Sequence, residues 1–361
     1  MEIFMKKMLI LCMLAFFCTS VSAMDISADS ACLIAADTGA VIYAKNETEK
    51  RPMASTTKIM TALLAAESGK GYDIVTISAN AELQEGSSIY LRRGERIKLN
   101  DLMLGLMLNS GNDAAVAIAE YISGSVDDFA KLMTETAVRA GAYNTQFKNP
   151  NGLDEPGHYT TAYDLALISA YAMKNPLFRQ TVATKSASAN LESGQTLYFS
   201  NHNKLLKIYD GAVGIKTGFT KSSGRCLVSA AERDGILLVA VTLNAPDDWN
   251  DHQKLLDYGF ENVTSKKIAS SGQVLKSLNG FDFSAAEDVV LPVCGREKFD
   301  IVLHLPKSAP SPMTKGEKAG FAEVFSENRL VKQFDIVAAS DIPMQISKKS
   351  FLSCVLRVIG L

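Results

Sequence analysis

The stretch Ala54-Ser55-Thr56-Thr57-Lys58-Ile59-Met60-Thr61-Ala62-Leu63-Leu64 decides how this chain is interpreted. It follows a predicted β-hairpin and opens an apolar helix. Residues i and i+3 lie on the same face of a helix, so the Lys58 amine can reach the Ser55 hydroxyl if Ser55 starts the first turn. A serine becomes a good nucleophile when a base takes its proton, and a lysine can be that base when burial and nearby positive charge keep it neutral. A lone Ser-x-x-Lys has a plain alternative, a cap serine on a solvated helix face.

Two further motifs favour the chemical interpretation. The stretch Leu108-Asn109-Ser110-Gly111-Asn112-Asp113-Ala114 gives Ser-x-Asn between two apolar helical runs. The stretch Gly214-Ile215-Lys216-Thr217-Gly218-Phe219-Thr220 gives Lys-Thr-Gly at the end of a β-like run. Ser-x-x-Lys, a Ser-x-Asn motif and Lys-Thr-Gly form the signature of penicillin-binding proteins and class A β-lactamases. The three motifs occur here in the expected order, 55 and 106 residues apart.

The sequence around these motifs resembles one family of penicillin-binding proteins. It is similar to the low-molecular-weight D-alanyl-D-alanine carboxypeptidases, serine peptidase family S11. The likeness runs from about Ser30 to Phe260 and continues more weakly into the C-terminal third. It is carried by Asp37-Thr38-Gly39, Arg51 to Lys58, Phe147 to Leu153, Tyr159 to Asp164 and Leu255 to Phe260.

The resemblance implies an α/β (α+β) fold of the transpeptidase and β-lactamase type. In that fold an antiparallel sheet is covered by helices, a helical lobe is inserted, and a small C-terminal β-sandwich follows. The order of the predicted elements agrees, because strands come first and last in the catalytic part and helices lie between them. The catalytic cleft is expected between the sheet and the helical lobe.

The resemblance also implies the reaction and the residues that perform it. The expected reaction removes the terminal D-alanine from peptidoglycan stem pentapeptides through an acyl-enzyme, which β-lactams such as penicillins would form irreversibly. The catalytic residues would be Ser55 as nucleophile, Lys58 as base and Ser110 as proton relay to the leaving D-alanine. Backbone N–H groups at the helix start would hold the oxyanion.

Substrate-binding residues follow from the same resemblance. They are Asn112 for the substrate amide, Lys216 for positive potential, Thr217 for the terminal carboxylate, and the neighbouring Gly218 and Thr220. Some relatives place an arginine near residues 247–251 to bind that carboxylate. This chain reads Asp248-Trp249-Asn250-Asp251 there, so its carboxylate partner beyond Thr217 and Thr220 is unassigned.

Several local elements can be predicted from periodicity and punctuation. Ser30 to Ala36 and Ala40 to Ala44 form a hairpin around Asp37-Thr38-Gly39. The apolar spacing predicts one helix from Ser55 to Glu67 and another from Asn100 to Leu108, with Asn100 as its cap. Ser110 and Asn112 would then lie in a loop between helices. The short alternating runs from Lys266 to Ala338 predict a small β-sandwich.

Composition and charge exclude other classes of function. The chain has 361 residues, of which 47% are hydrophobic, and a formal net charge of −2. This fits one large domain and a smaller one, and it gives no electrostatic reason to expect a nucleic acid partner. No zinc-like Cys/His spacing, Walker-type loop or dinucleotide glycine fingerprint occurs, so we expect no cofactor and no metal.

Four segments are expected along the chain: 1–23, 24–262, 263–340 and 341–361. The first is a predicted export signal peptide with a basic end and a short apolar run, for which an uncleaved anchor is the alternative. The second is the catalytic domain and the third the β-rich domain. The last segment carries a predicted amphipathic helix suited to a bilayer interface, with a docked C-terminal helix as the alternative. The expected location is the outer face of the cytoplasmic membrane.

The four cysteines after the predicted signal peptide, and His202, are interpreted as structural residues. Cys32 and Cys226 fall in apolar strand-like runs and are expected to be buried thiols. Together with Cys294 and Cys354 they are too scattered to form a disulfide framework. His202 lies near a motif and is expected to make a structural hydrogen bond rather than to act in catalysis.

Two competing functions remain open from sequence. A β-lactamase would need a glutamate to deacylate the penicilloyl ester, and no Glu-x-x-Leu-Asn string lies between the second and third motifs. Glu155 is the nearest carboxylate, in a context that resembles the carboxypeptidases. A non-catalytic penicillin sensor or cell-wall-binding protein is the second alternative. Release of D-alanine from a D-Ala-D-Ala peptide separates the enzyme from the binder.

Overall fold

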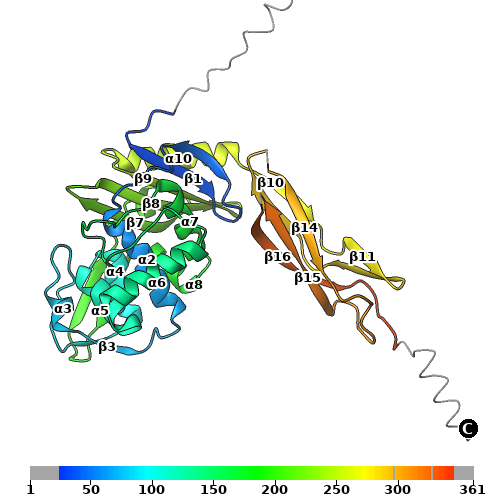
Figure 1. Cartoon of the computed structure of the whole chain (residues 1–361), viewed down its shortest axis with the longest axis horizontal. Helices are drawn as coiled ribbons and strands as arrows, with labels where there is room; N and C mark the ends of the chain where they lie inside the picture. The colour runs from blue at the N-terminus through cyan, green and yellow to red at the C-terminus, as the bar shows by residue number, and fades with distance from the viewer. Residues whose placement is uncertain (1–23, 296, 327, 345–361) are drawn as a thin grey trace, which may run out of the picture.

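The computed structural model describes residues 24–295, 297–326 and 328–344. A mixed α/β part is followed by a narrower, β-rich part (Figure 1). The predicted signal peptide and the predicted amphipathic tail both lie outside the described residues, apart from 341–344. No helix in the described part of the chain is long and apolar enough to span a membrane.

A five-stranded antiparallel sheet forms the centre of the α/β part. Its strand order is β2-β1-β9-β8-β7. Strands β1 and β9 and the middle of β8 are buried because both faces of the sheet are covered there. The predicted hairpin is correct, because β1 and β2 pair with each other, and β2 and β7 are the two edge strands. The strands are β1 (Ser30–Ala35), β2 (Val41–Lys45), β7 (Ala212–Thr220), β8 (Gly224–Arg233) and β9 (Ile236–Leu243).

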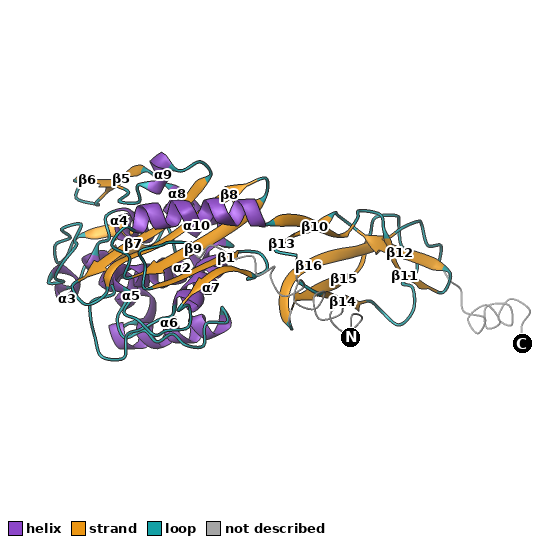
Figure 2. Cartoon of the chain, turned by 90° about the horizontal axis from the view of Figure 1, so that it is seen from above, coloured by secondary structure: helices purple, strands orange, loops and turns teal. Residues whose placement is uncertain are grey.

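Alternation along the strands divides the core between the two faces of the sheet. On β1, Cys32 and Ile34 contribute to the cluster shared with the helical lobe, whereas Leu33 faces helix α10 on the opposite side. Figure 2 shows α10 (Asp248–Asn262) along one face and the lobe helices on the other. The lobe contains α2 (Lys58–Glu67), α3 (Ala79–Glu82), α4 (Leu99–Leu108), α5 (Asn112–Ser123), α6 (Val126–Arg139), α7 (Ala162–Met173) and α8 (Pro176–Ala183). The short helix α9 (Leu205–Ile208) contributes Leu205 to the cluster on the α10 side. Two small hairpins, β3 (Ile74–Thr76) with β4 (Arg96–Lys98) and β5 (Ser186–Asn190) with β6 (Thr196–Ser200), complete the lobe.

Helix α10 approaches the sheet closely at a glycine. A Cβ atom on Gly259 would lie 2.6 Å from Leu238 Cδ1 and 2.8 Å from Leu33 Cδ2. Any larger residue must displace the helix or these two side chains, because protein interiors are close-packed. Gly259 therefore sets the spacing between α10 and the sheet.

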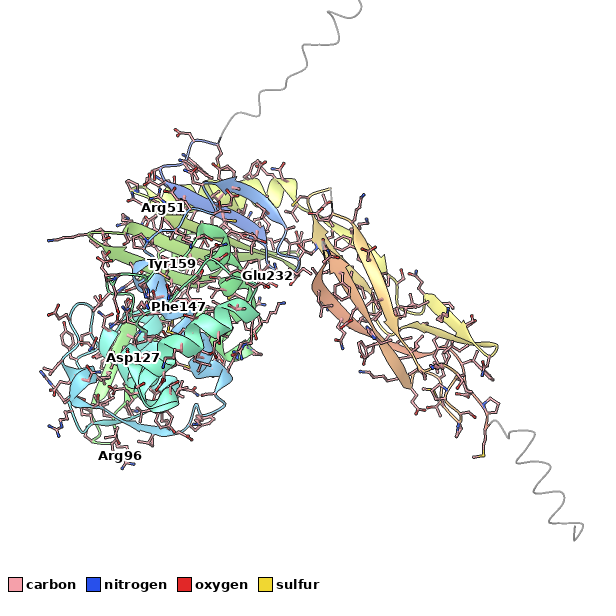
Figure 3. The ribbon with its side chains drawn as sticks, viewed as in Figure 1. Arg51, Arg96, Asp127, Phe147, Tyr159 and Glu232 are labelled. Carbon is pink, nitrogen blue, oxygen red and sulfur yellow. The ribbon has the colours of Figure 1, made fainter. Side chains whose placement is uncertain are left out.

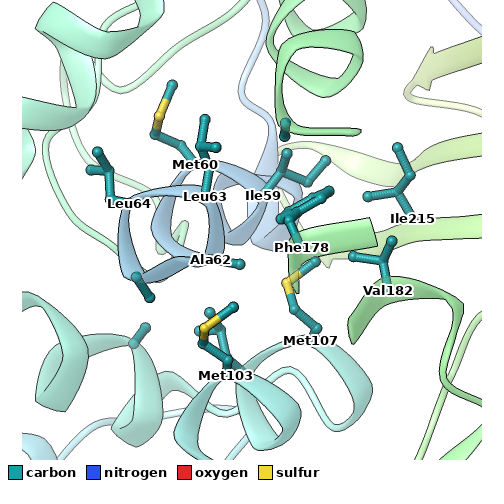
Figure 4. Close-up of a cluster of buried hydrophobic side chains, with 14 of the residues drawn as sticks. Ile59, Met60, Ala62, Leu63, Leu64, Met103, Met107, Phe178, Val182 and Ile215 are labelled. Atoms are coloured by element: carbon teal, nitrogen blue, oxygen red, sulfur yellow. The ribbon is translucent and has the colours of Figure 1, made fainter. Parts of the chain in front are cut away.

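Helix α2 is the centre of the helical lobe. From Lys58 to Ala65 every residue is buried, as expected for a helix surrounded by other elements. Figure 4 shows Ile59, Met60 and Leu63 among side chains from α4, α8 and β7. A site at the start of this helix is consequently held on a rigid element.

Two predicted helix starts are wrong in detail. Ser55 lies in a 3₁₀ turn, η1 (Ala54–Thr57), and the α-helix begins only at Lys58. Helix α4 begins at Leu99 and not after Asn100, and its cap residue Lys98 makes no side-chain cap bond. The Asn100 backbone N–H instead donates to Gly71 O, 2.9 Å away, which draws Asn100 into a tertiary contact.

The C-terminal part consists of two sheets that share one core. Strands β10 (Thr264–Ala269) and β13 (Val289–Val293) form the smaller sheet. The larger has the order β11-β12-β16-β15-β14. Both contribute to one buried cluster, which gives the predicted sandwich. The larger sheet comprises β11 (Val274–Leu278), β12 (Phe281–Ala285), β14 (Phe299–His304), β15 (Lys318–Ser326) and β16 (Arg329–Ala338).

Candidate active site

The first motif brings a hydroxyl and an amine together at the start of α2. Lys58 Nζ lies 2.9 Å from Ser55 Oγ. The same nitrogen donates to Asn112 Oδ1 at 2.7 Å and to Asn151 O at 2.6 Å. A neutral amine has two N–H donors and one lone pair. With both donors used by these two oxygens, its lone pair can accept the Ser55 proton.

The surroundings of Lys58 favour its neutral form. Its side chain is fully buried, and this burial is the main cause that lowers its pKa well below 10.5. The charge of Lys216 lowers the pKa further, whereas Asp113 raises it. Desolvation and a like charge both disfavour an ammonium ion. The arrangement thus provides a lysine able to act as a base.

The second motif lies where α4 ends and α5 begins. Ser110 has a positive φ of 62°, precedes α5 and lines the cleft. Asn112 is the first residue of α5 and not a loop residue as predicted. Besides accepting from Lys58, its side-chain Nδ2 donates to Glu85 O at 2.5 Å. Both ends of the Asn112 amide are therefore engaged within the protein.

The third motif lies on the edge strand β7. Lys216 is 1% exposed, and burial lowers its pKa to about 7. Its Nζ donates to Thr217 O at 3.0 Å. Gly218 packs against the nucleophile turn, since a Cβ there would lie 3.1 Å from both Ser55 N and Thr56 N. A side chain at this position would crowd the backbone amides of Ser55 and Thr56.

These motifs converge on a cavity of about 330 Å³. Four of the predicted residues line it, while Lys58, Asn112 and Lys216 lie behind that lining. The Thr220 hydroxyl is directed elsewhere and donates to Asp154 Oδ1 at 3.0 Å. The lining residues are Ser55, Ser87, Ser110, His202, Thr217, Gly218, Phe219, Arg225, Asp248 and Trp249.

A buried carboxylate fixes the rim loop over α5. Asp113 accepts the Ser88 hydroxyl at 2.7 Å and the backbone N–H groups of Ile89 and Leu91 at 3.1 and 3.0 Å. The loop runs from Glu85 to Leu91, and its Ser87 lines the cleft. Its position is therefore set by one side chain that directly follows Asn112.

A second loop packs against the 3₁₀ turn that contains Ser55. Phe147 and Tyr159 mark its two ends in Figure 3, and an antiparallel bridge between Gln146 and Tyr159 closes it. His158 Nδ1 accepts from the Lys148 N–H at 3.0 Å, so Nε2 carries the proton and donates to Thr57 Oγ1 at 2.8 Å. Burial lowers the pKa of His158 to about 4, which keeps the ring neutral.

Comparison with known proteins identifies the family. A family model described as D-alanyl-D-alanine carboxypeptidase matches residues 18–247. The chain belongs to the D-alanyl-D-alanine carboxypeptidase family. The predicted family and the prediction of an enzyme of this class are confirmed.

Curated relatives of this carboxypeptidase match most of its length. D-alanyl-D-alanine carboxypeptidase DacF of Bacillus subtilis is 32% identical over 351 residues, which cover 92% of this chain and 89% of DacF. A D-alanyl-D-alanine carboxypeptidase of Streptomyces is 37% identical over 243 residues, which cover 62% of this chain and 84% of the Streptomyces protein.

Solved structures agree with the fold of this carboxypeptidase. Penicillin binding protein 5 from Haemophilus influenzae is 26% identical with a TM-score of 0.67, covering 90% of this chain and all (100%) of its own. A Streptomyces DD-transpeptidase is 32% identical with a TM-score of 0.63, covering 67% and 100%. The predicted transpeptidase-like fold with a C-terminal β domain is confirmed.

The cleft of this carboxypeptidase also contains residues that the motifs did not indicate. Phe219, Arg225, Asp248 and Trp249 line it. Of these four residues, only Asp248 and Trp249 were named from the sequence, as part of the stretch that lacks an arginine. Arg225 could have been found by pairing strands across the Lys-Thr-Gly hairpin turn, which places it opposite Phe219.

The structure places His202 and two of the cysteines as follows. His202 lines the cleft, and burial with the Lys216 charge lowers its pKa. Cys32 and Cys226 are buried free thiols, as predicted. Among the described residues, no group of three or more His, Cys, Asp or Glu could hold a metal ion.

Proposed function

We propose that this chain is a serine-type D-Ala-D-Ala carboxypeptidase that removes the terminal D-alanine from peptidoglycan stem pentapeptides. One observation carries the proposal. The Ser55 hydroxyl faces the cleft 2.9 Å from the amine of a fully buried lysine. Nucleophile and base within hydrogen-bond reach are what acyl transfer through serine requires.

In the proposed acylation, Ser55 Oγ attacks the carbonyl of the penultimate D-alanine. Lys58 takes the hydroxyl proton and becomes an ammonium ion, stabilised by Asn112 Oδ1 and Asn151 O. The N–H of Ser55 and an N–H of the segment after Gly218 hold the oxyanion. Donors aimed at developing charge supply a large part of such catalysis.

Breakdown of the tetrahedral intermediate requires a proton on the departing nitrogen. Ser110 is proposed to relay it from Lys58 to the leaving D-alanine. Lys216 contributes positive potential, and Thr217 donates to the terminal carboxylate. Asn112 holds Lys58 in the present geometry, and its contact with the substrate amide stays a prediction. Water then hydrolyses the ester at Ser55.

The β-lactamase alternative is less well supported. Among the residues that line the cavity, the carboxylate is Asp248, which is bound to Arg225. Glu155 lies on another surface depression with Pro52 and Met53. Neither carboxylate is placed as a base for water at the Ser55 ester. Penicillins are accordingly expected to form a long-lived adduct and to inhibit.

The proposed location is the outer face of the cytoplasmic membrane, after export. The basic, apolar tail beyond Pro343 would attach the enzyme peripherally to an anionic lipid surface. Truncation after Pro343 is expected to give a soluble enzyme with unchanged turnover of a small peptide. Persistent membrane binding would instead assign the anchor to the apolar run Met8 to Cys18, and inactivity would make the tail part of the fold.

Mass spectrometry of the purified protein with a peptide ending in D-Ala-D-Ala tests the function. Loss of one D-alanine is expected from wild type and not from Ser55→Ala. Labelled penicillin should attach to wild type only. Penicillin attachment without D-alanine release would identify a sensor, and rapid penicillin hydrolysis would identify a β-lactamase.

A further inference from the structure

Arg225 lies in the cleft on the same face of the sheet as Thr217. Strands β7 and β8 pair Thr217 with Leu227 and Phe219 with Arg225. Directly opposed residues of an antiparallel pair point to the same face, and so do residues two apart on one strand. Thr217, Phe219 and Arg225 therefore share the face of the sheet on which α10 packs, and all three line the cavity together with Ser55.

A buried carboxylate holds the Arg225 side chain from behind. Its Nη2 donates to both oxygens of Asp248, at 2.8 and 3.0 Å. The Asp248 side chain is only 4% exposed, whereas that of Arg225 is 44% exposed. A guanidinium carries five N–H donors in a fixed plane. Within the described residues Nε and Nη1 have no hydrogen bond, so they remain available on the exposed side.

The other cations near the cleft are less suited to hold an anion. Lys58 and Lys216 are buried behind the lining, and burial lowers the pKa of both. Burial also lowers the pKa of His202. An arginine keeps its charge at every physiological pH and can bind a carboxylate through two parallel N–H groups. Arg225 is the cleft residue with these properties.

We propose that Arg225 binds the terminal carboxylate of the substrate together with Thr217, with Asp248 fixing the guanidinium plane. This inference rests on the proposed function, since it needs a substrate with a free carboxylate on its leaving group. It places the carboxylate-binding cation on β8 and not on the loop before α10. Arg225 would then decide that this enzyme removes a C-terminal residue.

The test compares two substrates that share the acyl group. One is an N-acyl-D-Ala-D-Ala peptide, and the other is the ester of the same N-acyl-D-alanine with a neutral alcohol. For Arg225→Gln, the ratio of kcat/KM values, peptide over ester, is expected to fall by about 10- to 100-fold, the loss expected for one charge-assisted hydrogen bond. Arg225→Lys should fall less, because it keeps the charge without the planar fork.

Lys221→Gln is the matched control. Lys221 lies in the turn of the same hairpin but outside the cavity lining. Its loss removes one positive charge near the cleft, and the peptide-to-ester ratio should stay at the wild-type value. A fall equal to that of Arg225→Gln would show general electrostatic attraction and overturn the specific contact.

Other outcomes separate this inference from the proposed function. Equal loss on peptide and ester in Arg225→Gln would give Arg225 a purely structural role and overturn the proposal. Unchanged kcat/KM values on both substrates would overturn it as well. The double variant Arg225→Gln with Asp248→Asn leaves no unpaired buried carboxylate. If the single variant fails to fold, the peptide-to-ester ratio of the double variant tests the proposal in its place. Wild type that releases D-alanine from no peptide would refute the function itself.

Discussion

The positive charge of Lys216 lowers the pKa of Lys58. Both side chains are fully buried, one on β7 and the other at the start of α2. Repulsion between two buried cations favours the state in which one of them is neutral. Lys216 thus has an effect on the proposed base in addition to any effect on the substrate.

Replacement of each lysine by arginine should separate these two effects. Lys58→Arg should reduce acylation by labelled penicillin by at least about 1000-fold, because a base must lose a proton and arginine does not. Lys216→Arg keeps a positive charge and should retain a measurable part of the rate. Full acylation in Lys58→Arg would exclude lysine as the general base.

The pH dependence of kcat/KM should show an alkaline limb near neutrality. The pKa of Lys216 is about 7, so its positive potential is lost as the pH rises through that value. Lys58 must be neutral to act as a base, and activity should fall again as the pH drops through its lowered pKa. In Lys216→Arg the alkaline limb should move to higher pH. An unmoved limb would assign it to another group.

Stability should also depend on the protonation of Lys216. An unfolded lysine has a pKa of 10.5, and burial lowers that of Lys216 to about 7. Between these values the unfolded state binds more protons, so the free energy of unfolding rises with pH. Each proton contributes a slope of about 1.4 kcal/mol per pH unit. Urea unfolding from pH 7.5 to 9.5 should show a smaller slope in Lys216→Met, and equal slopes would contradict the buried, titrating amine.

A methyl group at Gly218 should impair the proposed oxyanion site. Its Cβ would lie 3.1 Å from the Ser55 and Thr56 nitrogens, closer than ordinary van der Waals contact. Removal of one oxyanion donor costs about 100- to 1000-fold in kcat in serine hydrolases. We expect Gly218→Ala to lose about 10-fold or more in kcat, with a melting temperature close to wild type.

The parts of the fold that could be predicted depend on local signals. The β1–β2 hairpin is indicated by Asp37-Thr38-Gly39, and Gly39 adopts the positive φ of 70° that the turn requires. Helix α2 follows from its apolar run. The 3₁₀ turn at Ser55 could not be predicted, because Ala54 is held at a φ of 47° by contacts with the rest of the molecule. Gly152, for example, packs so closely that its Cβ would lie 2.0 Å from Ala54 O.

In the candidate site, too, some residues could be predicted from sequence and others depend on tertiary structure. The residues of the three motifs were predicted because their spacing and context resemble a family. Arg225 carries no such motif, and its place in the cleft depends on the pairing of β7 with β8. Asn151 contributes a backbone oxygen to Lys58, which no side-chain pattern indicates. Contacts of this kind are fixed by tertiary structure alone.

The glycine that spaces α10 from the sheet has a consequence for selectivity between leaving groups. Asp248 is the first residue of that helix, and Gly259 lies 11 residues further along it. A shift of the helix at Gly259 would carry Asp248 with it and tilt the guanidinium of Arg225. Natural variation at a packing position far from any substrate atom could therefore adjust the balance between hydrolysis of peptides and of esters. If Arg225 binds the substrate carboxylate, a substitution where α10 packs on the sheet would change leaving-group preference while Ser55 and Lys58 stay unchanged.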